Sequence, residues 1–489
     1  MAEPVYSRWD IDVYHGDCLD VMRALPDASI DAVITDPPYG LSELPPKKIA
    51  KALTAWLGGD REYVPTGQGG FMGRKWDEFV PPPAVWDECF RVLKPGGHLL
   101  SFAGSRTADL MGISIRLAGF EFRDTIDCRL SWYYGSGFPK SRDVSVDIDR
   151  MAGAEREVIG YDASRARPNR KYESGAIGNI GGNGKVSDRS DNGATLTAPA
   201  TVAARQWHGW GTALKPSHEP IIMARKPLTL TVAGTVLEHG TGALNIAACK
   251  VGTSKDVPTS SSGSRAMSYG FGAKADRDGM DPNTGRWPPN VVLSHSASLD
   301  PVSGEPIGDA CADGCVAGCA VAELDAQSGT LTSGKVGPDG FSGQFKAEVY
   351  GTFARNEIRP ETVYGDSGGA SRFFPVFRWE SKAPPAERPR VNGVAHPTCK
   401  PLELMKWLAR LITPPGGTIL DCFAGTGTTG QAARAEGFPA ILIEQDPVSI
   451  GLIKARLDAR PKTEAPADNA PAVDDAPVDL FDFLGGGAT

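Results

Sequence analysis

The tetrapeptide Asp36-Pro37-Pro38-Tyr39 carries residue types that can hold a planar amino group. A carboxylate and a proline carbonyl, which has no competing N–H beside it, can each accept one amino hydrogen. This arrangement turns the nitrogen lone pair toward a methyl donor. The ring of Tyr39 can stack on a base extruded from a duplex. By itself the tetrapeptide could also be an ordinary turn, because Asp-Pro opens many turns.

A second chemical signal is the Gly-rich segment 423–430, Phe-Ala-Gly-Thr-Gly-Thr-Thr-Gly. It lies between an expected strand and an expected helix, where its backbone amides can approach a ligand at the carboxyl edge of a sheet. Because it fits the pattern G-x-G-x-x-G, Glu444 at the next strand end could accept the ribose hydroxyls of NAD or of S-adenosylmethionine. A tight turn without any ligand is the third interpretation.

The elements around these two segments alternate between strand and helix. The tetrapeptide follows a short apolar, β-branched strand at 30–35, and the Gly-rich segment follows a strand at 418–421. Such alternation predicts a mainly parallel sheet. The other expected elements are helices at 48–57, 84–93, 107–118, 401–411 and 428–436, a turn at 94–97, and strands at 98–102, 120–127 and 439–444.

Composition shifts along the chain suggest five parts. Residues 161–204 are rich in Gly, Ser, Asn and Arg, residues 228–380 are turn-rich, and the end of the chain is rich in Ala, Pro and Asp. We expect a catalytic half at 1–160, a flexible DNA-contacting segment that returns to the sheet at 161–227, an irregular recognition domain at 228–380, a cofactor-binding half at 381–460 and a disordered acidic tail at 461–489.

The bulk composition is that of a globular protein. The 489 residues are 41% hydrophobic, without the uninterrupted apolar run of a membrane span or the pattern of a secretory signal, so we expect a cytoplasmic protein. The net charge of −8 is concentrated in the tail, where one lysine stands against six acidic residues. The nearly neutral body leaves room for a local basic surface that contacts phosphates.

The order of the two motifs resembles that of β-class DNA amino-methyltransferases, in which the catalytic motif precedes the cofactor loop. The resemblance covers about residues 10–140 and 390–460. It implies a Rossmann-like α/β fold, with a seven-stranded, mostly parallel sheet assembled from both ends of the chain. It also implies a circularly permuted motif order and an inserted recognition domain.

The resemblance assigns roles to individual residues. It places Asp36, Pro37, Pro38 and Tyr39 at the reacting centre, with Glu444 on the donor ribose and Asp17 near the donor adenine. His396-Pro397-Thr398-Cys399-Lys400-Pro401 resembles a family segment that lines the same pocket, although Lys400 could instead be a solvated residue at a helix start. The full implied cofactor set is Asp17, Asp36, His396, Thr398, Lys400, Asp421, Phe423, Ala424, Gly425, Thr426, Gly427, Thr428 and Glu444.

The implied activity is methyl transfer from S-adenosylmethionine to double-stranded DNA, at adenine N6. Cytosine N4 is the alternative target, and neither amino group requires a covalent enzyme intermediate. A glutamine-directed protein methyltransferase fits less well, because such enzymes carry asparagine first and the opposite motif order. A nucleotide-binding Rossmann protein or a catalytically silent DNA-binding regulator is the alternative of another class. Two questions stay open: whether the protein acts alone or as the partner of a restriction enzyme, and whether it is a monomer or a homodimer.

Other stretches suit contacts with DNA. Residues 132–140 and 210–220 combine aromatic side chains with lysine and resemble segments of the same family, and either could instead be packing. Arg165, Arg167, Arg170 and Lys171 are interpreted as a phosphate-contacting loop, with a solvated charge run as the alternative.

Three cysteines cluster at Cys311, Cys315 and Cys319, downstream of His295. Three sulfurs and an imidazole are the ligand inventory of one tetrahedral structural zinc. The spacing i, i+4, i+8 would equally place three small buried residues on one helix face, although the intervening glycines disfavour a helix. In the tail, residues 478–484 resemble peptides that dock on the bacterial sliding clamp, with an unused apolar terminus as the alternative.

Overall fold

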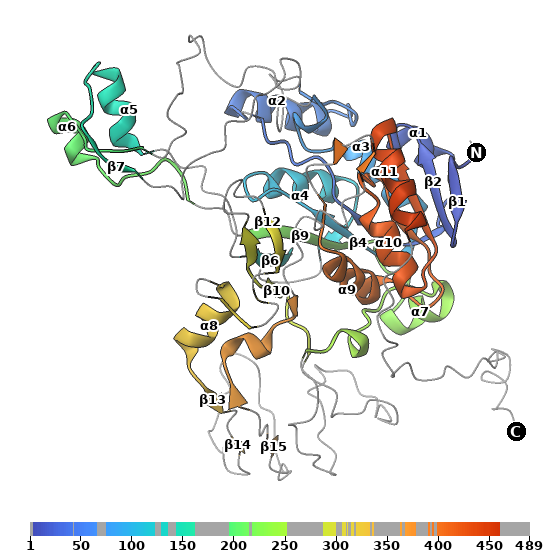
Figure 1. The fold of residues 1–489 in the computed structure, drawn as a ribbon. Helices are drawn as coiled ribbons and strands as arrows, with labels where there is room; N and C mark the ends of the chain where they lie inside the picture. Colours follow the sequence, from blue (N-terminus) through green and yellow to red (C-terminus); the bar gives the residue numbers. More distant parts are fainter. Residues whose placement is uncertain are drawn as a thin grey trace, which may run out of the picture.

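A computed structural model gives the arrangement of these elements (Figure 1). It describes residues 3–42, 44–65, 75–122, 129–134, 143–161, 195–214, 218–251, 287–299, 306–309, 311, 314–316, 319–332, 335–336, 362–363, 367–377, 390–391, 394–395 and 399–459.

The centre of the fold is a sheet of eleven strands. Ten run in the order β1-β2-β21-β20-β3-β4-β9-β6-β10-β17, and β5 pairs with β9. In that order, the strands are β1 (Tyr6–Arg8), β2 (Ile11–His15), β21 (Ala440–Glu444), β20 (Ile419–Asp421), β3 (Ile30–Thr35), β4 (Leu93–Phe102), β9 (His218–Arg225), β6 (Arg129–Tyr134), β10 (Val291–Ser294) and β17 (Val376–Phe377), with β5 at Glu121–Phe122.

The run of seven strands from β2 to β6 confirms the expected α/β sheet. All neighbours from β2 to β4 are parallel, and β9 alone runs antiparallel to both strands beside it. The two C-terminal strands β20 and β21 lie between the N-terminal strands β2 and β3, so both ends of the chain build one sheet. The sheet exceeds the expected seven strands because β1, β5, β10 and β17 extend its edges or add to β9.

Helices cover both faces of the sheet, and alternate residues of each strand serve one face or the other. In β3, Ala32 and Ile34 pack toward α9, α10 and α11, whereas Val33 packs toward α1, α2, α3 and α4. This period of two is the strand pattern expected for a sheet buried on both sides. The first layer consists of α9 (Leu402–Ile412), α10 (Thr428–Glu436) and α11 (Pro447–Asp458), and the second of α1 (Cys18–Arg23), α2 (Pro46–Leu57), α3 (Pro83–Val92) and α4 (Ala108–Leu117).

The expected turn at 94–97 is wrong, because these residues lie within β4. Leu93 pairs with Ile30 and His98 with Ala32, so the strand takes up the extra residues as an irregularity in the ladder. Gly96 lies at φ 79°, where a side chain would meet Thr235 and the backbone of Gly242. The Pro-Gly-Gly signal thus marks a bulged strand. Of the expected strand 120–127, only β5 lies in the described residues.

Two smaller units extend from the sheet. One comprises α5 (Val144–Met151), β7 (Val158–Tyr161), β8 (Thr195–Thr197) and α6 (Val202–Gln206) and projects at the upper left of Figure 1. The other contains α8 (Ala320–Ser328) and the short 3₁₀ helix η6 (Ala370–Phe373), below the sheet edge in that view. The remaining short elements are η2 (Lys75–Asp77), α7 (Val232–His239), η4 (Ala247–Cys249) and the strand pairs β11 (Ala297–Leu299) with β12 (Pro306–Asp309), β13 (Leu331–Thr332) with β16 (Ser367–Gly368), β14 (Lys335–Val336) with β15 (Thr362–Val363), and β18 (Arg390–Val391) with β19 (Val394–Ala395).

The expected recognition region 228–380 contributes β10 and β17 to the main sheet, so part of it is continuous with the central sheet. None of the helices in the described ranges has the length and apolar character needed to cross a bilayer.

Candidate active site

The candidate site forms where neighbouring parallel strands end at one edge of the sheet. Asp36 directly follows β3, and Asp421 is the last residue of the adjacent β20. The hydroxyl of Thr35 donates to the Asp421 carboxylate at 2.7 Å. This buried hydrogen bond ties the start of the tetrapeptide to the start of the Gly-rich loop.

The side chain of Lys400 joins the tetrapeptide to β9. Its ammonium lies 2.9 Å from Asp36 Oδ2 and 3.2 Å from Glu219 Oε2, and it donates to the Tyr39 hydroxyl at 2.9 Å. The Tyr39 hydroxyl in turn donates to Glu219 at 3.3 Å. With only 11% of its side chain exposed, Lys400 is an enclosed ion-pair partner, which excludes the solvated alternative.

Electrostatics in this cluster hold the lysine charged and the tyrosine neutral. Burial disfavours the ammonium, but the carboxylates of Asp36 and Glu219 outweigh it and raise the pKa of Lys400. Burial and the same two carboxylates raise the pKa of Tyr39. Two carboxylates thus share one cation in this cluster.

The tetrapeptide is held in place by a side chain that sequence patterns missed. Asp77, on η2, accepts the backbone N–H groups of Tyr39 at 2.7 Å, Gly40 at 2.9 Å and Leu41 at 3.4 Å. Gly40 lies at φ 68°, and a side chain there would meet the backbone of Val80 at 2.8 Å. The sequence gives no sign of this contact, because a single aspartate 38 residues from Tyr39 has no periodic signal.

The Gly-rich loop begins with a buried carboxylate. Asp421 accepts hydrogen bonds from the hydroxyls of Thr35 and Thr429 and from the N–H of Phe423. Burial nevertheless outweighs these bonds and raises the pKa of Asp421 to about 6. The carboxylate therefore anchors both ends of the loop at a cost in desolvation.

The loop is closed by Glu444 at the end of β21. Its two oxygens accept the N–H groups of Gly425 and Asp446, each at 2.8 Å, and burial raises its pKa. Gly425 lies at φ 53°, and among the described residues a Cβ there would have only the Phe423 carbonyl oxygen within 4 Å. The space beside Gly425 is therefore open, as a ligand cradle requires.

Gly427 differs from Gly425 in what surrounds it. It caps the N-terminus of α10 at φ 75°, and a Cβ there would lie 3.0 Å from Ile453 of α11. The glycine is required by helix packing, which is a different reason from contact with a ligand.

The other expected cofactor residues lie around the same strand ends or outside the described residues. Asp17 follows β2 and caps α1 by accepting the N–H of Leu19 at 2.8 Å. Thr426 is buried, with its hydroxyl 3.2 Å from the Cys399 thiol and 3.4 Å from the Thr428 hydroxyl. Ala424 donates its N–H to Ile443. His396 and Thr398 lie outside the described residues.

Of the stretches expected to contact DNA, only parts are described. Residues 132–134 form the end of β6, while 135–142 and the basic residues Arg165, Arg167, Arg170 and Lys171 lie outside the described ranges. Trp207 and Trp210 pack edge to face at 4.9 Å, and Trp210 is 60% exposed. Glu219, near the end of the second stretch, reaches the site through its ion pair with Lys400.

The four expected metal ligands converge. The imidazole and three thiol ligand atoms of His295, Cys311, Cys315 and Cys319 all lie within 4.8 Å of one another. Helix α8 begins at Ala320, with Cys319 as its N-cap, so the interpretation of three cysteines along one helix face is wrong.

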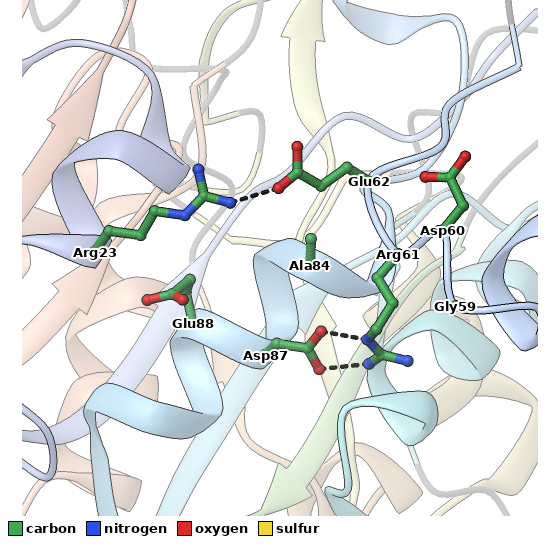
Figure 2. Close-up of a pocket in the computed structure, with 8 residues that line it drawn as sticks. All are labelled: Arg23, Gly59, Asp60, Arg61, Glu62, Ala84, Asp87 and Glu88. Atoms are coloured by element: carbon green, nitrogen blue, oxygen red, sulfur yellow. Dashed lines mark hydrogen bonds and ion pairs between the residues drawn. The ribbon is translucent and has the colours of Figure 1, made fainter.

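A separate hollow lies between α1, the end of α2 and α3 (Figure 2). Its two arginines are already paired, Arg23 with Glu62 at 2.5 Å and Arg61 with Asp87. No expected site residue lines it, and we assign it no ligand.

The fold and the strand-end site define a Rossmann-like α/β protein with a carboxylate-proline motif beside a Gly-rich ligand loop. Residues 349–454 match the model of a family of N6 and N4 enzymes described as DNA methylase.

The chain is also similar to individual proteins. It is 32% identical over 93 residues to the type II methyltransferase M.BamHI of Bacillus amyloliquefaciens, which covers 18% of this chain and 16% of that relative. Two solved structures align over most of their length but with low scores. PvuII DNA methyltransferase, described as cytosine-N4-specific, has 13% identity, a TM-score of 0.39 and coverage of 94% and 91% of the two chains. TTHA0409 of Thermus thermophilus, solved with S-adenosyl-L-methionine, has 16% identity, a TM-score of 0.31 and coverage of 91% and 93%.

Proposed function

We propose that the chain is a DNA methyltransferase that transfers a methyl group from S-adenosylmethionine to the exocyclic amino group of an extruded base, at adenine N6. The observation that carries the proposal is the meeting of two motifs at adjacent strand ends. Asp36 and the Gly-rich loop follow the parallel strands β3 and β20, and the Thr35–Asp421 hydrogen bond joins them. A donor in the loop would therefore lie beside an amino acceptor.

The loop residues fit the donor. The open space beside Gly425 accommodates a ligand close to the backbone, and Glu444 is fixed where a carboxylate can accept ribose hydroxyls. We assign donor binding to this loop, Glu444 and Asp17, with His396 and Thr398 as further expected contacts. S-adenosylmethionine would supply an electrophilic methyl group.

The residues of the tetrapeptide would hold the acceptor. The Asp36 carboxylate and a proline carbonyl of the tetrapeptide accept the two amino hydrogens and turn the nitrogen lone pair toward the methyl group. The Asp36 carboxylate also stabilises the positive charge that develops on nitrogen. Lys400 contacts Asp36 from the protein side, and its second carboxylate partner, Glu219, keeps it in place when a base competes for Asp36.

The choice of adenine over cytosine rests on the first residue of the tetrapeptide. Enzymes that resemble this chain and carry aspartate there mostly modify adenine, whereas serine is commoner in the cytosine-N4 group. A carboxylate is also the stronger acceptor for an amino group that gains positive charge. Mass spectrometry of digested product DNA distinguishes the two, and N4-methylcytosine without N6-methyladenine would refute the assignment.

The proposed partner is double-stranded DNA, contacted by residues 161–227 and recognised by residues 228–380. One structural zinc, held by His295 and the three clustered cysteines, is the second proposed cofactor. Docking of the tail on a sliding clamp stays a prediction from sequence resemblance.

Substitution of Asp36 tests the mechanism. Asp36→Ala should bind S-adenosylmethionine normally in equilibrium dialysis, because Lys400 keeps Glu219 as a partner. Methyl transfer should fall by at least about 100-fold, the order expected when one transition-state acceptor is removed. Asp109→Ala, an exposed carboxylate on α4, is the matched control and should keep its activity. Near-normal transfer by Asp36→Ala would refute the mechanism, and failure of the wild type to bind the donor would favour the nucleotide-binding or silent regulator alternative.

A further inference from the structure

The Cys311, Cys315, Cys319 and His295 cluster has the spacing of a tetrahedral centre. The Nδ1 atom of His295 lies 3.4 Å from the Cys315 sulfur and 3.5 Å from the Cys319 sulfur. Zinc bonds of about 2.3 Å to sulfur and about 2.0 Å to nitrogen place neighbouring ligand atoms roughly 3.5 Å apart across a tetrahedral angle. The side chains therefore need little movement to hold an ion.

The ligands come from two separate segments of the chain. His295 directly follows β10, Cys311 and Cys315 lie in the turn region before α8, and Cys319 is the N-cap of α8. The backbone N–H of His295 also donates to Phe377 at the end of β17. An ion at this point would join a strand of the main sheet to the unit that contains α8.

The apolar core around the cluster is small. Its buried members are Leu293, Val321 and two of the cysteines, with Val376 and Phe374 among the partly buried neighbours. Units with so few buried apolar side chains usually need a disulfide or a metal for stability. Among its described residues, the part of the chain that α8 organises, including η6 through the Asp325 carboxylate and Ser371, therefore has few buried apolar side chains of its own.

The sheet leads from this cluster to the candidate active site in two steps. Strand β10 pairs with β6, where Val292 is level with Trp132, and Trp132 is level with Glu219 on β9. Glu219 is the second carboxylate partner of Lys400. The unit is thus attached at the edge of the sheet nearest to the strand that carries Glu219.

We infer that His295, Cys311, Cys315 and Cys319 bind one zinc ion that fastens the α8 unit to the β10 edge of the catalytic sheet. The zinc has no part in methyl transfer. The consequence for DNA, which rests on the proposed function, is that the metal fixes a recognition surface beside the site without affecting the donor loop.

The test uses the full-length protein, purified without chelator and then dialysed against a weak one. The variant is Cys315→Ser, because Cys315 is exposed and its replacement disturbs little packing. The control is Cys249→Ser, a buried cysteine packed against α9, away from the cluster. The readouts are zinc content, limited proteolysis mapped by mass spectrometry, thiol titration after denaturation and binding of S-adenosylmethionine by calorimetry.

We expect about one equivalent of zinc in the wild type and in Cys249→Ser, and loss of zinc in Cys315→Ser. Metal-stripped wild type and Cys315→Ser should be cleaved faster within residues 291–377, with donor affinity unchanged. A metal-free wild type with normal protection, or one with fewer than the nine titratable thiols of the sequence, would overturn the inference. Zinc whose removal leaves proteolysis unchanged would overturn its fastening role. Failure of every protein to bind the donor, with the metal results as expected, would overturn the proposed function and leave the zinc site standing.

Discussion

At the scale of single residues, the candidate site depends on how charges are balanced. Asp36 and Glu219 face one ammonium, so Lys400 is the only counter-charge that the two carboxylates share in the described part of the chain. A buried carboxylate that loses its partner is costly, because desolvation is no longer offset by attraction. Lys400 therefore has a structural role in addition to any contact with a bound base.

This balance of charges predicts how the removal of Lys400, alone or together with the charge of Glu219, changes the free energy of unfolding. Lys400→Met keeps a long side chain but should lower the free energy of unfolding by about 2 kcal/mol, because two carboxylates are left facing each other. The double variant Lys400→Met with Glu219→Gln should recover part of that loss, since one unpaired charge is removed. Urea denaturation at neutral pH measures both effects. Lys406→Met, in an i,i+3 pair on α9, is the control and should change stability by less than about 0.5 kcal/mol. A double variant less stable than the single one would contradict the charge-balance argument.

At the scale of elements, the sequence predicted most of what positions the site. Strand β3 and helix α10 have the expected bounds, because each combines a clear apolar period with strong end signals. The sequence did not reveal the bulge in β4, since Pro-Gly-Gly is also a turn signal. It also missed Glu219 and Asp77, whose roles depend on contacts between segments far apart in the chain.

The contacts of Asp77 on the short helix η2 predict that this residue positions the tetrapeptide for methyl transfer. Asp77→Ala removes the acceptor of three backbone N–H groups behind the tetrapeptide, so the Asp36 carboxylate should shift and methyl transfer should fall by about 10- to 100-fold. Donor affinity should stay the same, because the Gly-rich loop is untouched. Asp77→Asn retains an acceptor oxygen and should restore most of the rate. Single-turnover kinetics with calorimetry checks this, and equal losses of donor affinity in both variants would show that Asp77 acts through general stability instead.

At the scale of the whole molecule, one buried group should shape the pH dependence of stability. The pKa of Asp421 is raised from 3.8 to about 6 by burial. In the unfolded chain the carboxyl ionises first as pH rises, while the folded protein keeps it protonated up to about pH 6. The raised pKa therefore leaves the free energy of unfolding unchanged below about pH 4. Above about pH 6 it lowers that free energy by its full amount.

The wild type should accordingly lose stability relative to Asp421→Asn between about pH 4 and pH 7, by up to about 3 kcal/mol. The asparagine side chain of the variant carries no charge at any pH in this range. The difference in the free energy of unfolding between the two proteins therefore reports on Asp421 and not on other groups that titrate in the range. Urea denaturation curves at several pH values across that range give the comparison. A difference that does not vary with pH would mean that the carboxyl ionises equally easily in both states.

The insertion of β20 and β21 between β2 and β3 has a consequence for protein synthesis. A ribosome makes β2, β3 and β4 before the two strands that separate β2 from β3, which follow only after the long intervening part of the chain. Until then the middle of the sheet is missing, and β2 and β3 have no native neighbour on one side. Pairing over such long chain distances is slow. A nascent chain would therefore contain the tetrapeptide without its donor loop, and the full site would assemble only after β20 and β21 have been made.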